Sequence, residues 1–266
     1  MEIVGYLAAL IMGLSLGLIG GGGSILTVPI LVYLFSQEPL TATTGSLFVV
    51  GTTALVGALT NARKKMIDYK TGVLFAIPSF AGVYLARHFL LPNLPEIIFS
   101  YDGIILTKGL LVMGLFAIVM VLASRAMISS VKPSKSDGTS PRHASLVKIG
   151  WSGFLVGITT GFVGAGGGFL IIPALVVLLK ISMQKAVGTS LAIIAVNSLF
   201  GFLISINTHS LNWHILLIIT AIGVVGIFGG QALSKSVDEK TLKKGFGYFV
   251  FVVGLAVLID QILKLH

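Results

Sequence analysis

Long apolar stretches, separated by short polar ones, make up most of the chain. No Asp, Glu, Lys or Arg occurs in the stretches 3–37, 39–62, 149–179 and 186–234. About twenty apolar residues are enough for a helix to cross a bilayer. The pattern therefore predicts an all-α polytopic membrane protein built from eight apolar segments. These segments are 3–35, 39–61, 70–91, 104–125, 147–179, 185–208, 211–234 and 245–263.

The composition supports this interpretation and excludes other classes. Hydrophobic residues make up 55% of the chain and charged residues 10%, and the mean hydropathy is +1.02, which excludes a water-soluble enzyme. The net charge of +9 does not indicate nucleic-acid binding, because Lys and Arg flank the apolar segments instead of forming a basic face. The chain has no cysteine, and no acid or histidine pattern has the spacing of metal ligands. We therefore expect no catalytic residues, no metal and no cofactor.

The chain also matches itself at an offset of 144 residues, without gaps. Residues 17–32 and 161–176 share eight identities in sixteen positions, and the register continues for about seventy residues. Residues 129–145 between the halves are rich in Ser, Pro and Lys, which is typical of an exposed linker. We expect a first membrane repeat at 1–128, a cytoplasmic linker at 129–146 and a second membrane repeat at 147–266.

Positive charges favour one of two topologies for these repeats. If all eight segments cross the membrane, ten of the eighteen Lys and Arg residues fall on one side and eight on the other. If the first segment of each half is a re-entrant hairpin, fifteen fall on one side and three on the other. Because cytoplasmic loops carry the excess of Lys and Arg, we expect inverted repeats of one glycine-broken hairpin and three transmembrane helices. Parallel repeats of four crossings each are the alternative.

A glycine cluster interrupts the first segment of each half, at 20–24 and 164–168. Each glycine disfavours a helix by about 1 kcal/mol relative to Ala, so we expect the helix to open there and to restart near Ser24 and Gly168. Open backbone at membrane depth is tolerated mainly where it is buried in protein or lines a cavity. Breaks of this kind mark binding sites in transporters, and the N–H groups of a restarting helix suit an anion.

A second element follows each cluster, at 41–46 and 187–190, and supplies hydroxyl groups and a glycine. We expect it to open the next helix and to add donors and a second helix N-terminus to the site. No Lys or Arg lies in these stretches, so neutral dipoles are expected to bind the anion. The predicted substrate-binding residues are Gly20, Gly21, Gly22, Gly23, Ser24, Thr44, Ser46, Gly164, Gly166, Gly167, Gly168, Thr189 and Ser190.

Simpler interpretations apply to the two serines of this set and to glycines elsewhere in the chain. Ser46 and Ser190 can bond back to their own helix, as Ser and Thr often do in apolar helices. Small residues four positions apart usually let helices pack closely, and we assign this role to the pairs Gly13/Gly17, Gly153/Gly157 and Gly226/Gly230.

The paired motifs resemble a known family. Gly-x-x-Gly-x-Gly-Gly begins at Gly17 and Gly161 and is followed by a proline at Pro29 and Pro173. An Ala-x-x-[Gly/Thr]-Ser-Leu element follows at 42–47 and 186–191. Together they are similar to the TauE/SafE sulfite exporter family. The resemblance implies a multi-pass protein of the bacterial cytoplasmic membrane that moves sulfur-containing anions such as sulfite, sulfoacetate and other sulfonates.

From the residues and the resemblance together, we expect a secondary transporter for a small anion, a sulfur oxyanion or organosulfonate. It would work by alternating access around the glycine breaks. The partners implied are the anion and the lipid bilayer. An anion channel and a non-transporting membrane scaffold are the alternatives.

Overall fold

The computed structural model describes residues 2–101, 104–129, 146–164, 166–173, 175, 181–207, 210–234 and 239–264. The predicted linker, residues 129–146, lies outside them except for its two end residues. The first half contains α1 (Glu2–Ile19), η1 (Gly22–Leu26), α2 (Thr27–Pro29), η2 (Ile30–Leu34), α3 (Pro39–Arg63), α4 (Tyr69–Tyr84), η3 (Leu85–Leu90), α5 (Leu91–Asn93), β1 (Ile97–Tyr101), β2 (Ile104–Thr107) and α6 (Lys108–Ser129). The second half contains α7 (Leu146–Val163), α8 (Gly168–Pro173), α9 (Met183–Ser205), α10 (Trp213–Leu233) and α11 (Glu239–Leu263).

Acidic or amide side chains start three of the long helices. Glu38 accepts hydrogen bonds from the backbone N–H groups of Leu40 and Thr41 at 3.2 and 3.0 Å, and Pro39 follows it at the first helical position of α3. Asp68 caps α4, and Asn212, 144 residues later, caps α10 in the same way. Equivalent positions of the two halves therefore begin equivalent helices.

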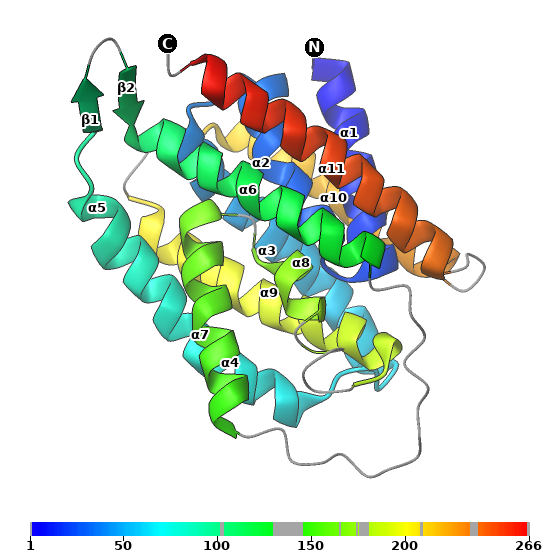
Figure 1. The fold of residues 1–266 in the computed structure, drawn as a ribbon. Coiled ribbons are helices and arrows are strands. Elements are labelled where there is room, and N and C mark those ends of the chain that lie inside the picture. The colour runs from blue at the N-terminus through cyan, green and yellow to red at the C-terminus, as the bar shows by residue number, and fades with distance from the viewer. Residues whose placement is uncertain are drawn as a thin grey trace.

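The helices pack as pairs that join the two halves (Figure 1). Helix α3 packs on α9 and α6 on α11, and these are equivalent helices of the two halves. Helix α1 packs on α10, and its equivalent α7 packs on α4. Four described helices are long and apolar enough to cross a membrane, namely α3, α9, α10 and the continuous run Tyr69–Asn93. Of these, α3 and α9 are the most deeply buried, so they form the centre of the bundle.

Glycines allow two of these pairs to approach closely. A methyl group on Gly13 of α1 would lie 2.9 Å from the Cα atom of Gly223 in α10, and one on Gly157 of α7 would lie 2.8 Å from the Cα atom of Ser79 in α4. A methyl group on Gly226 would likewise lie 2.9 Å from the Cα atom of Gly13. The prediction that these spaced glycines serve helix packing is confirmed.

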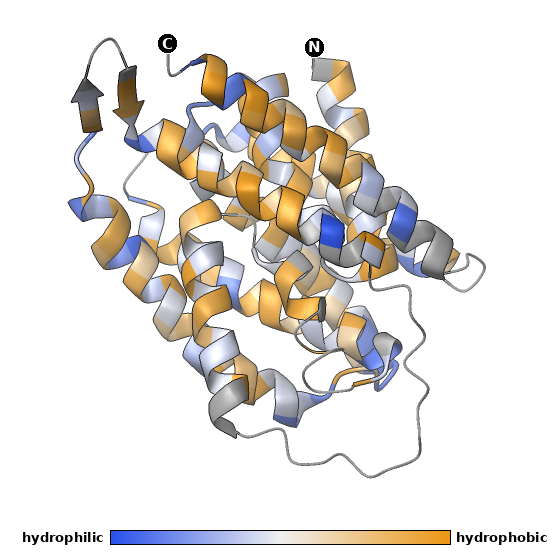
Figure 2. Cartoon of the chain, in the orientation of Figure 1, coloured by the Kyte–Doolittle hydropathy of each residue, from blue (hydrophilic) through white to orange (hydrophobic). Residues whose placement is uncertain are grey.

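Helix ends meet at both ends of the bundle, within the first half at one end and between the halves at the other. Pro39 at the start of α3 lies 3.6 Å from the Cβ position of Gly109 at the start of α6. At the other end of α3, the carbonyl group of Met66 lies against Gly188, one turn into α9. Both chain termini and the β1–β2 hairpin are at the same end of the molecule (Figure 1). Figure 2 shows apolar residues along the helices and hydrophilic residues mainly near their ends.

The hairpin of β1 and β2 is a feature that the hydropathy pattern did not predict. The two strands are antiparallel, with Ile97 opposite Thr107 and Tyr101 opposite Ile104. We expected a membrane segment from residue 104, whereas α6 begins at Lys108. The apolar residues of β2 extend the hydrophobic run of α6, and a short apolar run does not by itself distinguish strand from helix.

Candidate functional site

Helices α1 and α7 both end at a glycine in the left-handed conformation. Gly20 has a φ angle of +80° and Gly164 one of +72°. The N–H group of Gly20 donates to the carbonyl group of Leu16 at 2.8 Å, and that of Gly164 to the carbonyl group of Thr160 at 2.8 Å. This is the usual way in which a glycine closes a helix, because a side chain is strained at these angles. The predicted helix breaks are confirmed at both positions.

The chain restarts differently after the two breaks. Helix α8 begins at Gly168, as predicted. In the first half a 3₁₀ turn begins at Gly22, and α-helical geometry returns at Thr27 instead of near Ser24. The hydroxyl group of Ser24 donates to the carbonyl group of Gly21 at 2.8 Å within this turn.

The two breaks touch each other inside the bundle. A methyl group on Gly168 would lie 2.5 Å from the Cα atom of Gly21. Gly21, Gly22, Gly23 and Gly168 are all buried. Segments separated by more than one hundred residues thus bring their glycine clusters into direct backbone contact.

Two serine hydroxyl groups connect the breaks reciprocally across the halves. Ser190 of α9 donates to the carbonyl group of Gly20 at 2.8 Å. Ser46 of α3, 144 residues earlier, donates to the carbonyl group of Gly164. Both hydroxyl groups also have an acceptor on their own helix, the carbonyl group of Val187 for Ser190 and that of Thr43 for Ser46, at 2.9 Å in each case. Each serine therefore bonds back to its own helix, as the simpler interpretation predicts, and also binds the break of the other half, which was not predicted.

The remaining glycines of the second cluster are also closely packed. Gly166 and Gly167 have φ angles of +65° and +73°. A methyl group on Gly166 would lie 2.6 Å from the hydroxyl oxygen of Ser198 in α9 and 2.7 Å from Val50 in α3. The Ser198 hydroxyl is buried and has no hydrogen-bond partner among the residues that the structure describes. The second break therefore faces the central helix pair.

The hydroxyl elements do not open their helices, so that expectation was wrong. Helix α3 begins at Pro39 and α9 at Met183, and residues 41–46 and 187–190 lie inside them. Glu38 already caps α3 through its side chain, and Ser182 already occupies the N-cap position of α9, about one turn earlier. These elements contribute side chains to the breaks but no second helix N-terminus.

The side-chain oxygens of two further predicted site residues bind groups other than the backbone of the glycine breaks. The hydroxyl oxygen of Thr189 accepts from the backbone N–H group of Asp68 at 2.9 Å, at the start of α4. The hydroxyl group of Thr44 donates to the carbonyl group of Leu40 at 3.2 Å and accepts from Arg87. Thr189 and Thr44 thus extend the polar region in two different directions.

Arg87 is the residue that the sequence analysis missed. It lies in η3, a π-helical turn that continues α4, and only 6% of it is exposed. Its Nη1 atom donates to the hydroxyl oxygen of Thr44 at 3.2 Å and to that of Ser205 at 3.5 Å. A neighbouring helix thus places a cation beside Thr44, one of the predicted site residues, although the glycine and hydroxyl stretches themselves carry no Lys or Arg. The buried face of a π turn, which is frequent at functional sites, was the missing signal.

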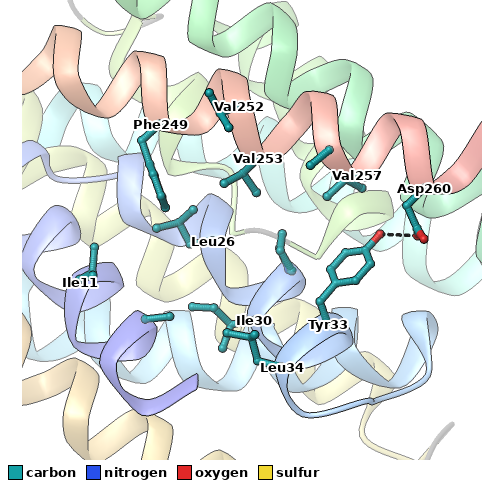
Figure 3. Close-up of a pocket in the computed structure, with 13 residues that line it drawn as sticks. Ile11, Leu26, Ile30, Tyr33, Leu34, Phe249, Val252, Val253, Val257 and Asp260 are labelled. Carbon is teal, nitrogen blue, oxygen red and sulfur yellow. Dashed lines mark hydrogen bonds between the residues drawn. The ribbon is translucent and has the colours of Figure 1, made fainter. Parts of the chain in front are cut away.

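A separate apolar pocket of about 520 Å³ lies between α1, the segment from η1 to η2 and α11 (Figure 3). Ile11, Leu26 and Val253 are among its lining residues. At one end the hydroxyl group of Tyr33 donates to the Oδ2 atom of Asp260 at 2.9 Å. None of the predicted substrate-binding residues lines this pocket.

The chemical groups at the breaks suit a polar solute more than a metal ion. The described residues include no group of three or more His, Asp or Glu side chains that could hold a metal. The site instead combines buried hydroxyl groups, glycine backbone and one guanidinium group, which are donors to oxygen atoms.

Comparisons with known proteins agree with this architecture. The family model "Sulfite exporter TauE/SafE" matches residues 5–257. A probable membrane transporter protein of Xylella fastidiosa (strain Temecula1) is 30% identical over 93% of this chain and 91% of its own length. The probable membrane transporter protein YunE of Bacillus subtilis is 26% identical over 97% of this chain and 98% of its own, and MJ0441 of Methanocaldococcus jannaschii, with the same description, is 27% identical over 97% and 94%. No solved structure matches the chain significantly. The chain, a multi-pass membrane protein, belongs to the sulfite exporter TauE/SafE family of membrane transporters.

Proposed function

We propose that this protein is a secondary transporter that moves a small anion, a sulfur oxyanion or an organosulfonate, across the cytoplasmic membrane. It does so by alternating access around the two glycine breaks. The proposed substrate-binding residues are those predicted from the sequence: Gly20, Gly21, Gly22, Gly23, Ser24, Thr44, Ser46, Gly164, Gly166, Gly167, Gly168, Thr189 and Ser190.

The observation that carries this proposal is the reciprocal pair of serine–glycine hydrogen bonds between the halves. A single hydrogen bond of this kind contributes about 1 kcal/mol, so it can be exchanged during a transport cycle. Each serine also has an acceptor on its own helix, so releasing the glycine carbonyl does not leave the hydroxyl group without a partner. Such a hydrogen bond holds a helix break against the central helix of the other half and still lets the two separate.

The proposed mechanism requires inverted repeats, at 1–128 and 147–266, joined by a cytoplasmic linker at 129–146. Helix α1 of the first half packs on α10 of the second, and its equivalent α7 of the second half packs on α4 of the first. This reciprocal packing supports a two-fold relation between the halves. The contact of Met66 with Gly188 supports the hairpin topology, because it puts the end of α3 beside the start of α9. In eight simple crossings these two positions belong to opposite sides of the membrane.

Flux measured in proteoliposomes tests the transporter assignment. Uptake of labelled sulfite or a sulfonate should saturate with concentration and should show countertransport. Weak saturation with electrical conductance would favour an anion channel, and no flux of any anion would favour a scaffold.

The glycine site is tested with Gly166→Val, because a side chain there meets Ser198 and Val50. We expect this variant to insert into the membrane and to lose transport. Gly114→Val is the control, since no atom lies within 4 Å of a Cβ at Gly114 in α6. Wild-type flux in Gly166→Val would refute the assignment of this glycine.

A further inference from the structure

Among the described residues, one complete edge of the Arg87 guanidinium group has no hydrogen-bond partner. Its Nη1 atom donates to Thr44 and Ser205, whereas Nε and Nη2 are buried and bind no group in the described part of the chain. The two ion pairs between described residues, Lys108–Glu96 and Lys264–Asp260, do not involve it. Within the part of the chain that the structure describes, no carboxylate neutralises Arg87.

A buried cation without a carboxylate partner is stabilised by binding an anionic ligand. Transfer of an unpaired charge out of water costs several kcal/mol, even after the protein relaxes around it. Charged residues inside a membrane segment are therefore rare and usually face a partner or a transport path. Arg87 lies within the apolar run Tyr69–Asn93, so this argument applies to it directly.

The free edge has the geometry of an oxyanion fork. The N–H bonds of Nε and Nη2 are coplanar and point to the same side, so they fit two oxygens carried by one atom. We propose that Arg87 binds the transported anion bidentately through Nε and Nη2, which makes it the residue that selects oxyanions over halides. This proposal rests on the anion-transport function proposed above.

The position of Arg87 brings a bound anion close to the second glycine break. Its neighbour Ala86 lies 2.8 Å from the Cβ position of Gly161, three residues before Gly164. Thr44, which accepts from Arg87, directly follows Thr43, whose Cβ lies 2.5 Å from the Cβ position of Gly164. An anion on Arg87 therefore lies next to both elements that pack against the break, α3 and η3.

Polar residues continue from Arg87 along one face of α9. Ser205 contacts Arg87, and Ser198, two turns earlier, has a buried hydroxyl group without a partner. Ser190 lies about two turns further on and binds the first break. Arg87 is thus at one end of a buried row of hydroxyl groups that passes both breaks.

The two halves differ at this position. The residue 144 positions after Arg87 is Gln231, which is also buried. Its Nε2 atom donates to the carbonyl group of Gly57 at 3.1 Å, and its Oε1 atom has no partner. A neutral amide cannot replace a guanidinium fork, so only one of the two equivalent positions holds an oxyanion in this way.

The test uses the purified full chain in detergent, in Tris chloride at fixed ionic strength. Thermal unfolding is followed against sulfite, sulfate, acetate and bromide, because a ligand of the folded state raises the midpoint. Acetate tests whether a carboxylate stabilises the protein as a sulfur oxyanion does. Bromide tests an anion that has no pair of oxygens. The variants are Arg87→Lys, Arg87→Met and the control Arg125→Gln, which removes an exposed charge at the end of α6.

We expect at least one oxyanion, and not bromide, to stabilise the wild type and the control. Arg87→Lys keeps the charge but loses the fork and should weaken oxyanion binding about tenfold or more. Arg87→Met should abolish the shift, while its midpoint without oxyanion equals or exceeds that of the wild type, because a buried unpaired charge has been removed. A merely structural arginine would instead lower this midpoint.

Other outcomes overturn the proposal. These are oxyanion binding that survives in Arg87→Lys and Arg87→Met, equal stabilisation by bromide, and no stabilisation by any oxyanion. Flux in proteoliposomes separates this proposal from the transport function. Unchanged flux and affinity in Arg87→Lys would refute the role of Arg87 alone, whereas Arg87-dependent binding without any flux would refute transport alone.

Discussion

The hydroxyl group of Ser190 donates to the carbonyl group of Gly20 across 170 residues of sequence, at 2.8 Å. The equivalent bond runs from Ser46 to Gly164. In both bonds a central helix of one half binds the helix break of the other half. The duplication seen in the sequence is therefore used reciprocally, since neither half completes the surroundings of its own break.

Ser190→Ala should lower the free energy of unfolding by about 1 kcal/mol, because the buried Gly20 carbonyl loses its donor. Unfolding of the purified protein measures this difference. Ser124→Ala is the matched control, since Ser124 is fully buried and, within the described part of the chain, donates to Val121 of its own helix at 2.7 Å. Equal losses of unfolding free energy in the two variants would show that the hydrogen bond between the halves contributes nothing to stability.

The helix pair α1–α10 gives a second prediction. Gly13→Ala places a methyl group against the backbone of Gly223 and should destabilise the protein by roughly 1–3 kcal/mol, as overpacking of a tight contact does. Gly114→Ala in α6 meets no atom within 4 Å and should stabilise the helix by up to about 1 kcal/mol. A Gly13→Ala protein as stable as the wild type would contradict the close packing of these helices.

The helix breaks and the packing glycines were predictable because their signals are local. Four small residues in sequence disfavour a helix wherever they occur, and a glycine at Gly20 or Gly164 is needed for the backbone angle itself. The contact of Gly21 with Gly168 was not predictable, because it depends on how distant helices pair. A single sequence with an internal duplication does not specify whether α1 packs on its own half or on the other.

The two main errors have the same origin. Arg87 lies near the end of the apolar segment 70–91, and the count of positive charges placed it with the loop residues on one side of the membrane. Its burial follows from the π turn of η3 and from Thr44 and Ser205, which come from two other helices. The starts of α3 at Pro39 and α9 at Met183 lie at or near the predicted segment starts, 39 and 185, but the hydroxyl elements further along were wrongly expected to open these helices.

The contact of α11 with η2 supplies a third prediction. Asp260 accepts through Oδ2 from Tyr33 at 2.9 Å, from Gln261 at 2.8 Å and from Lys264 at 2.8 Å. Tyr33→Phe removes one of three donors and should lower stability by about 1 kcal/mol, and Asp260→Ala should lower it further because all three donors lose their acceptor. Tyr248→Phe, at an exposed position of α11, should change unfolding by less than about 0.5 kcal/mol. A larger loss in Tyr33→Phe than in Asp260→Ala would contradict this network.

The topology gives the fourth prediction, and the absence of native cysteines makes it directly measurable. Single cysteines at Lys64, Ser100 and Lys185, all exposed, report the side of the membrane through a thiol reagent that does not cross it. With a re-entrant hairpin in each half, Lys64→Cys and Lys185→Cys should react only after the cells are opened, and Ser100→Cys should react in intact cells.

Lys185 is the position that decides between the two topologies. Eight simple crossings put Lys64 and Lys185 on opposite sides, whereas a hairpin in each half puts them on the same side. The approach of Gly188 to the backbone of Met66 requires the same side, since these residues lie close to the two labelled positions. Ser100→Cys is the internal control, because both topologies place it opposite Lys64. Labelling of Lys185→Cys in intact cells would therefore refute the inverted hairpin arrangement and, with it, the alternating-access mechanism proposed for the two breaks.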